Sequence, residues 1–412
     1  MSMPQNKPSR TSARVAMGLL FVLAVLGAFA YGMQARDGLG VTGLSRDVPW
    51  GLYISQFTFL VGIGASAVTV LLPYYVHRQK AFARALILGE VVAVIALGQA
   101  LSCILVDLGQ PSRLLNILLY PSPSSLMFWD CLTLTGYLVL SLVGLMAALF
   151  ARGASSAKWV RRLALATIPW AIGIHVVTAL LYAGLSARPA WMTAVLAPRF
   201  LATAFASGPA LLILLAGGLS RAKVFDVGRD AIARLSVIMT YAAALSVLLA
   251  ALEAFTAVYS GIPSAREHLE YLFLGLDGHV GLVVFNYLSW GLLLFALTVL
   301  LIPGLRRRAG FATVATAAIL LSVLVDKGLC LVTSGFVPSP LGYVQDYQPS
   351  LPELAIVVGI YASGALVFLA LRPLFTIAQA NSPVSESPVH ALNQPLPTER
   401  EPGMAGVAPM ET

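Results

Sequence analysis

The sequence predicts an all-α, polytopic membrane protein with about ten transmembrane helices. Of its 412 residues, 58% are hydrophobic and only 11% are charged, and a soluble core does not need that much apolar surface. In addition, runs of about 20 apolar residues, the length that crosses a bilayer, recur along the whole chain. The ten runs are 14–33, 52–74, 85–106, 126–150, 162–185, 198–219, 232–260, 280–303, 310–333 and 354–376.

Two of these runs need a separate justification. The first ends with Ala-Phe-Ala at residues 28–30, which resembles a signal-peptidase site. Because the run is long enough to span a membrane, we interpret it as a retained anchor. The sixth run is the weakest, since Pro198 and Pro209 interrupt it.

The two ends of the chain are polar. Residues 1–13 precede the first run, and residues 377–412 contain Pro, Ser and Glu but few large apolar side chains. Segments of this kind cannot bury enough apolar surface to fold alone. We therefore predict a cytoplasmic N-terminal tail, a membrane domain over residues 14–376 and a disordered cytoplasmic C-terminal tail.

The distribution of Lys and Arg predicts the orientation in the membrane. With the N-terminus inside, the tails and the loops after the even-numbered helices hold 19 of the 26 Lys and Arg residues. The positive-inside rule then places both termini in the cytoplasm, as expected for the inner membrane of a prokaryote. This asymmetry also explains the net charge of +8 without nucleic acid as a partner.

Five ionisable residues lie within or at the edge of the predicted helices. Each charge near the bilayer centre costs about 2.5–3.5 kcal/mol on insertion scales, so such residues invite a functional interpretation. They could relay protons or bind the polar head of a ligand, and a purely structural role stays open for each. The five are Glu90, Asp130, His175, Glu253 and Asp326.

One stretch, residues 103–137, organises the polar groups. An apolar helix ends at Asp107, and a Gly-Gln-Pro turn and a short amphipathic piece with Arg113 follow. Pro121 and Pro123 break the chain again before the next helix, which carries Asp130 in its first turns. Helices joined in this way place several polar groups at one level of the bilayer.

The sequence contains no motif for a resident metal centre. The three cysteines, Cys103, Cys131 and Cys330, form no C-x-x-C pair that would suggest an iron–sulfur cluster. His175 is the one histidine well inside a predicted helix, and one histidine cannot supply a bis-histidine haem. No nucleotide-binding or zinc-protease motif is present either.

Two motifs resemble the NrfD / polysulfide reductase membrane-subunit family. One is Val-Asp-Leu-Gly-Gln-Pro-Ser-Arg at 106–113, followed by Met-Phe-Trp-Asp at 127–130; the other is Ser-Arg-Asp-Val-Pro-Trp-Gly-Leu-Tyr at 45–53. The resemblance extends over residues 14–376, and the ten-span form is most similar to the DsrP-type branch. Gln110 and Ser112 depart from the Arg and Asp of many relatives.

The resemblance implies a fold and a set of partners. The fold would be two four-helix bundles, helices 2–5 and 6–9, flanked by helices 1 and 10. Such subunits typically hold no haem or iron–sulfur cluster, bind a quinol or quinone, often menaquinone, near the outer face, and exchange electrons with a periplasmic ferredoxin-like iron–sulfur subunit. For a DsrP-type subunit the complex would add a multihaem cytochrome c, a haem-b membrane subunit and a cytoplasmic iron–sulfur subunit, in sulfur metabolism.

The resemblance also suggests roles at a quinone site. Quinol oxidation needs an acceptor for each phenolic proton, and Asp130 and His175 are the first choices. Trp129, Trp50 and Tyr53 could wall the ring, although interfacial aromatic residues are as often membrane-belt anchors.

Other residues have weaker assignments. Glu90, Glu253 and Asp326 could form a proton path, and Asp107 and Arg113 could fix the loop that meets the iron–sulfur partner. Two alternative functions remain, a secondary transporter and a non-catalytic membrane anchor. Ten helices with buried carboxylates would suit a transporter as well.

Overall fold

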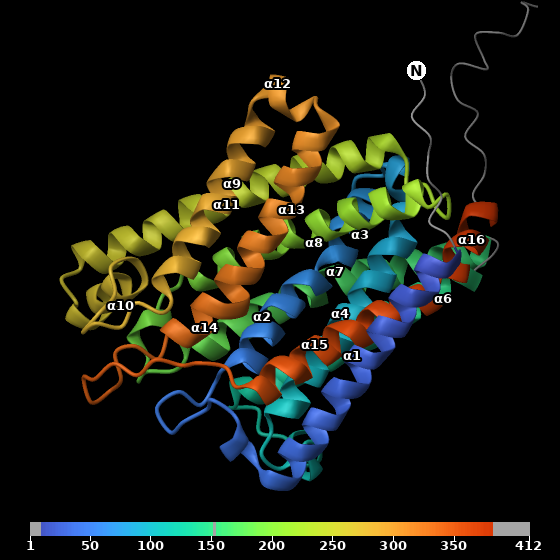
Figure 1. The fold of residues 1–412 in the computed structure, drawn as a ribbon. Helices are drawn as coiled ribbons and strands as arrows, with labels where there is room; N and C mark the ends of the chain where they lie inside the picture. Colours follow the sequence, from blue (N-terminus) through green and yellow to red (C-terminus); the bar gives the residue numbers. More distant parts are fainter. Residues whose placement is uncertain (1–9, 151–153, 382–412) are drawn as a thin grey trace, which may run out of the picture.

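Ten long helices cross the molecule from end to end, as the sequence predicts (Figure 1). The computed structural model describes residues 10–150 and 154–381, and within these ranges no β-strand occurs. Most of the two predicted tails, residues 1–9 and 382–412, therefore lies outside the described residues. The chain is a multi-pass, all-α membrane protein.

The bounds of the spans agree with the predicted runs to within several residues. Helix α8 is continuous through Pro209, so the interruption expected there does not occur. The spans are α1 (Arg10–Asp37), α2 to η2 (Leu52–Val76), α4 (Ala85–Asp107), α6 (Leu126–Phe150), α7 (Ala154–Ala183), α8 (Leu196–Arg221), α9 (Arg229–Tyr259), α11 (Val283–Leu301), α13 to α14 (Ala309–Ser334) and α15 (Leu351–Ala370) followed by α16 (Arg372–Asn381).

Short helices lie in the connections at the two ends of the molecule. We call the end with the connections 38–51, 108–125, 184–195, 260–282 and 335–350 the long-loop face, and the end where α1 begins the short-loop face. The long-loop face carries η1 (Leu39–Val41), η4 (Pro111–Arg113), α5 (Asn116–Leu119), η5 (Pro189–Trp191) and α10 (Pro263–Phe273). The short-loop face carries η3 (Lys80–Ala83) and α12 (Pro303–Arg306).

Two spans are interrupted by π-helical turns. The second consists of α2 (Leu52–Gly64), α3 (Ser66–Leu71) and the π-turn η2 (Leu72–Val76), in which Pro73 removes a backbone donor. The ninth consists of α13 (Ala309–Val325), the π-turn η6 (Asp326–Cys330) and α14 (Leu331–Ser334). Turns of this kind are frequent at functional sites, and η6 carries two of the charged residues of the membrane domain.

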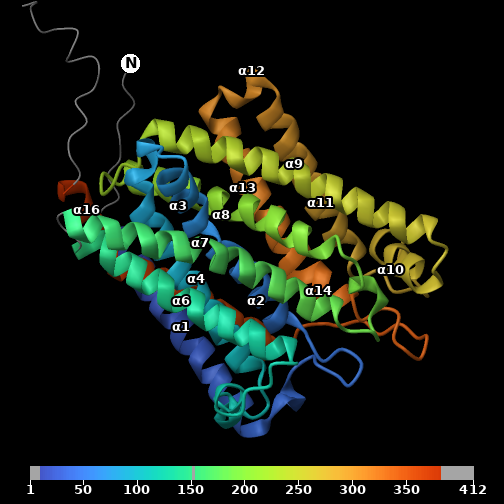
Figure 2. The same ribbon diagram turned by 180° about the vertical axis from the view of Figure 1, so that it is seen from behind.

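The spans pack as two rings of four. In the first ring the second to fifth spans contact one another in sequence order, and α7 closes the ring by contacting α2 and α3. The sixth to ninth spans form the second ring in the same way, and α13 closes it by contacting α8 (Figure 2). Helix α1 packs along α15, where Gly27 and Gly359 meet so closely that a Cβ on Gly27 would lie 2.6 Å from Cα of Gly359. These contacts are consistent with the predicted bundles, although α2 and α7 of the first ring also contact α8 of the second.

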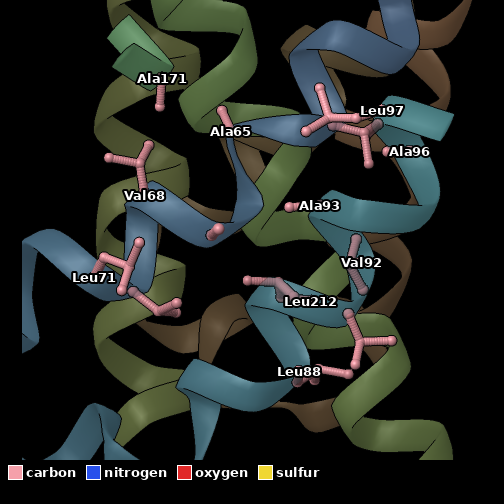
Figure 3. Packing of buried hydrophobic residues seen from close by; sticks show 14 of the residues in the cluster. Ala65, Val68, Leu71, Leu88, Val92, Ala93, Ala96, Leu97, Ala171 and Leu212 are labelled. Carbon is pink, nitrogen blue, oxygen red and sulfur yellow. The ribbon is translucent and has the colours of Figure 1, made fainter. Parts of the chain in front are cut away.

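The core of the first ring is built from small and branched side chains. Figure 3 shows Ala65 and Val68 of the second span in the same cluster as Ala93 and Ala96 of α4. Close approach is required at Gly89, where a Cβ would lie 2.6 Å from Cγ2 of Val70. Small residues at such contacts let membrane helices gain dispersion energy in place of a hydrophobic driving force.

Tyr347 and Glu353 hold the long-loop face to the helices through a group of hydrogen bonds that we call the Tyr347 clasp. The Tyr347 hydroxyl accepts a hydrogen bond from the Leu52 backbone N–H (2.8 Å) and donates one to the Glu353 carboxylate (2.5 Å). The other oxygen of Glu353 accepts from the backbone N–H groups of Gly43 (2.7 Å) and Ser350 (2.8 Å). Burial and the Glu353 hydrogen bond raise the pKa of Tyr347, so the phenol keeps the proton that the clasp requires.

Candidate functional site

Asp130 is directed into the first ring. Its side chain is only 4% exposed, and Oδ1 accepts a hydrogen bond of 2.5 Å from the Thr178 hydroxyl of α7. The adjacent Trp129 points outward: it is 42% exposed, and its indole N–H donates to the Pro123 carbonyl (2.8 Å). The helix therefore separates two residues that were predicted to serve the same site.

A stripe of polar side chains continues from Asp130 along α7. His175, Thr178 and Tyr182 are three and four residues apart, so they share one face of the helix, and all three are buried. Nδ1 of His175 donates to the Ala171 carbonyl (2.7 Å), which leaves Nε2 as an acceptor, and this buried atom has no partner in the described part of the chain. The Tyr182 hydroxyl bonds the Thr58 hydroxyl of α2 (2.6 Å).

The stripe ends in an aromatic cluster at the long-loop face. Trp50 packs edge-on against Tyr182, with ring centroids 5.4 Å apart, and stacks on Trp191 at 6.0 Å. Phe336 meets Trp50 edge-on at 6.2 Å. We use the name Asp130 group for Trp50, Thr58, Asp130, His175, Thr178 and Tyr182. Neither Asp130 nor His175 lines any of the cavities described below.

Tyr53 lies on a different side of α2 from the Asp130 group. Its hydroxyl donates to Oε1 of Gln34 (2.6 Å), and Nε2 of Gln34 donates to the Val106 carbonyl (2.6 Å). The side chain is therefore held against α1 and α4, away from Trp50 and the α7 stripe.

The two residues predicted for partner docking differ in exposure. Asp107 is half-buried at the end of α4, and its Oδ1 has no hydrogen-bond partner among the described residues. Arg113 is exposed in η4 on the long-loop face. No ion pair joins the two in the ranges that the structure describes.

Glu90 is enclosed in the first ring. It is 3% exposed, its Oε2 has no described partner, and its Oε1 lies so close to α6 that a Cβ on Gly144 would be 2.8 Å away. The carboxylate is therefore not a surface group that reaches the membrane boundary.

A charged triad joins three spans of the second ring. Arg199 of α8 donates to Glu253 of α9 (2.7 Å) and to Asp326 of the π-turn η6 (3.0 Å). The three side chains are 15%, 19% and 22% exposed. We call them the Arg199 triad. Arg199 was not among the predicted site residues, although it lies in the predicted sixth run and has a sign opposite to its two partners.

Lys327 follows Asp326 but turns away from it. Its Nζ donates to the Phe200 carbonyl (3.1 Å) and lies 4.1 Å from the centroid of the Phe200 ring. The side chain is only 2% exposed. The π-turn thus directs one charge to the triad and the other to an aromatic face.

A cavity of about 410 Å³ opens beside the Arg199 triad. It lies between η5, α8, α9, α10, α11 and the ninth span, at the long-loop end of the second ring. Among its lining residues are all three members of the triad, together with Trp191, His268 and Asn286. A second cavity, of about 390 Å³, lies between α1, α4 and α15 and has mainly apolar walls.

Comparison with known proteins gives this arrangement a family. The model of the family described as polysulphide reductase, NrfD, matches residues 40–338. The chain is 28% identical to the membrane subunit of a putative dimethyl sulfoxide reductase of Halobacterium salinarum, over 87% of this chain and 90% of the relative. It is 23% identical to one of the subunits of the selenate reductase of Mesobacillus selenatarsenatis, with 87% and 93% covered.

A third relative is named for its electron donor. The Hdr-like menaquinol oxidoreductase integral membrane subunit of Archaeoglobus fulgidus is 23% identical, over 87% of this chain and 92% of the relative. All three relatives are named as subunits of reductases or oxidoreductases, and the first and third are named as membrane subunits. The family match covers the Asp130 group and the Arg199 triad. The chain belongs to the NrfD (polysulphide reductase) family of membrane subunits.

Proposed function

We propose that this chain is the quinone-reactive membrane subunit of a respiratory electron-transfer complex. It exchanges electrons between menaquinol or quinone and a periplasmic ferredoxin-like iron–sulfur subunit. Two findings support the proposal: the relative named a menaquinol oxidoreductase membrane subunit, and the buried Asp130 group, which ends in aromatic residues at the long-loop face.

The Asp130 group has open acceptors for a ligand that donates hydrogen bonds. Nε2 of His175 is buried without a described partner, and Oδ2 of Asp130 accepts no hydrogen bond from any described residue. A buried acceptor without a hydrogen-bond donor costs free energy unless a ligand or a water molecule supplies the donor. A quinol bound there would supply two hydroxyl donors and, on oxidation, two protons and two electrons.

The chain's own groups would then receive and hold the protons. Thr178 fixes the Asp130 carboxylate by its hydrogen bond, and Ala171 fixes the tautomer of His175 that accepts at Nε2. Trp50, which packs on Tyr182, would contact the ring. We retain Tyr53 and Trp129 as proposed ring contacts, although both need movement to reach the Asp130 group.

The proton path is proposed in two parts. Glu90 would serve the first ring on its short-loop side, and Glu253 and Asp326 would serve the second ring through the Arg199 triad. Buried carboxylates in membrane segments commonly belong to proton relays.

The partners are proposed from the long-loop face. This face would lie in the periplasm, with both termini in the cytoplasm of a prokaryotic cell. Arg113 is exposed there and could meet the iron–sulfur subunit, while Asp107 would hold the docking loop from beneath. We further propose a Dsr-type complex of sulfur metabolism with a multihaem cytochrome c, a haem-b membrane subunit and a cytoplasmic iron–sulfur subunit.

The test is menaquinol-driven reduction of the iron–sulfur partner in the purified complex. We expect Asp130→Asn to lower turnover by about 10²-fold or more, the scale of general acid–base catalysis. Glu270→Gln, in an exposed ion pair, is the control and should keep its turnover. Unchanged turnover in Asp130→Asn would remove that residue from the mechanism.

Measurements of substrate flux and of variant stability test the two alternatives. A secondary transporter would show substrate flux from the isolated chain and no stable iron–sulfur partner. A membrane anchor would tolerate carboxamide substitutions at Asp130, Glu253 and Asp326 with changes in stability alone.

A further inference from the structure

The cavity beside the Arg199 triad has the form of a ligand site. Its volume of about 410 Å³ falls within the range of small-molecule pockets. Helix α10 covers it on the long-loop side, and small residues of α9, Ala250, Ala254 and Ala257, leave the space open on another side. The function proposed above assigns no ligand to this cavity.

The charges around the cavity favour a neutral ligand. Arg199 is shared by Glu253 and Asp326, and Lys327 follows Asp326 in the π-turn η6, with its Nζ directed to Phe200 behind the cavity wall. The formal charges of these four groups cancel. A cation or an anion would therefore enter a low-dielectric site with no net opposite charge to compensate its loss of hydration.

The polar groups that remain open are acceptors. Oε1 of Glu253 receives no hydrogen bond from the described residues, and Asn286 uses its N–H to bond the Leu272 carbonyl (3.1 Å), which leaves its oxygen free. His268, also in the lining, donates through Nδ1 to the Ser334 carbonyl (3.1 Å). Burial lowers the pKa of His268 to about 4, which keeps the ring neutral at pH 7.

Three aromatic side chains form part of the cavity wall. Trp191, Phe273 and Trp290 line it, and each belongs to a different element. Aromatic side chains pack favourably against a planar ring, by stacking or edge-on. The cavity therefore combines flat apolar walls with several acceptors.

We infer that this cavity is a second ligand site, which takes a neutral, lipophilic, planar ring with hydroxyl donors, the chemistry of a quinol. The inference rests on the proposed function, because it adds a second molecule of the same class to the same chain. In this site Glu253 and Asn286 would accept the hydroxyl groups, while Arg199 would hold the Glu253 carboxylate in place.

The test counts bound molecules on the full-length chain in lipid nanodiscs. The probe is the quinol analogue 2-n-heptyl-4-hydroxyquinoline N-oxide, whose fluorescence is quenched on binding. We expect two molecules per chain. Ala254→Trp, which fills the cavity, should reduce the count to one, whereas Ala251→Trp, on the exposed side of the same helix, should leave it at two.

A variant of the Asp130 group distinguishes this inference from the proposed function. Asp130→Asn combined with Thr178→Val should remove the other molecule. If the wild-type chain binds one molecule that only this double variant removes, the second site is wrong and the proposed function stands. If it binds one molecule that only Ala254→Trp removes, the second site is correct and the Asp130 site is wrong. No binding to the wild-type chain overturns both.

Photolabelling keeps the inference testable if Ala254→Trp does not fold. An azido-substituted naphthoquinone is irradiated with the wild-type chain, and the labelled peptides are identified by mass spectrometry. We expect labels within residues 250–273, and excess quinoline N-oxide should prevent them. Labels confined to α6 and α7 would contradict a second site.

Discussion

Arg199 compensates the two carboxylate charges in the second ring, and the stability of the fold should depend on it. It is the partner of two carboxylates in a site that is largely screened from solvent. Removing one member of a buried ion pair typically costs about 3–5 kcal/mol, because the remaining charge is left uncompensated. We therefore expect Arg199→Gln to lower the free energy of unfolding by this amount, as measured by thermal unfolding of the purified chain.

Two further variants make this prediction specific. Arg266→Gln breaks the exposed pair with Glu270, where the Arg266 side chain is 68% exposed, and should cost less than about 1 kcal/mol. Adding Glu253→Gln and Asp326→Asn to Arg199→Gln should recover much of the lost stability. Equal effects of Arg199→Gln and Arg266→Gln would contradict a structural role for the triad.

His268 should make the folded chain less stable at acidic pH. Burial lowers the pKa of its ring to about 4 in the folded chain, compared with about 6.5 when unfolded. The folded state thus binds fewer protons between these values, so stability falls as pH drops from about 6.5 to 4, by about 3 kcal/mol in all. His268→Asn should lose this part of the pH dependence, measured as the difference in unfolding temperature between pH 7.5 and pH 5. The exposed His77→Asn should behave as the wild-type chain does.

At the scale of elements, the Tyr347 clasp predicts that Gly51 does not tolerate a side chain. A Cβ on Gly51 would lie 2.5 Å from Cζ and Oη of Tyr347, so Gly51→Ala must displace that ring and break its bonds to Leu52 and Glu353. We expect a loss of about 1–3 kcal/mol, the usual cost of overpacking. Hydrogen exchange at the start of α2 should also become faster.

The matched control lies in the same loop. A Cβ on Gly40 would meet no atom within 4 Å, so Gly40→Ala should change stability little. If both variants unfold at the same temperature, the clasp does not hold the long-loop face.

The sequence predicted the membrane-spanning helices far better than the contacts between them. Runs of apolar residues reflect a one-dimensional requirement, the thickness of the bilayer, and all ten spans were found from them. The π-turn at Asp326 carries no equivalent signal, because it depends on packing between spans. For the same reason the polar stripe at His175, Thr178 and Tyr182 was recognised only at its histidine.

The pairing of charges was also beyond the sequence. Glu253 and Asp326 were identified as buried carboxylates, but which cation they meet depends on how α8, α9 and the ninth span cross. Arg199 was missed because it stands at the end of its predicted run, next to Pro198, where a boundary cation is ordinary. Opposite charges at similar depths in neighbouring spans were the available signal.

At the scale of the whole molecule, the two faces should lie on opposite sides of the membrane. The tails and the short connections hold 19 of the 26 Lys and Arg residues, and of the remainder Arg199 and Lys327 are enclosed in the second ring. Basic residues in short loops stay on the cytoplasmic side. We therefore expect the short-loop face, where α1 begins, to lie in the cytoplasm.

Labelling of single cysteines measures this orientation. Arg307 is exposed on the short-loop face and Leu341 on the long-loop face, and Cys131→Ser removes the one native thiol that is not buried. In spheroplasts, a membrane-impermeant maleimide should label Leu341→Cys at once and Arg307→Cys only after the membrane is opened. The reverse pattern would put the aromatic end of the Asp130 group on the cytoplasmic side, where a periplasmic iron–sulfur partner cannot reach it. The proposed electron exchange with a periplasmic subunit would then have to be abandoned.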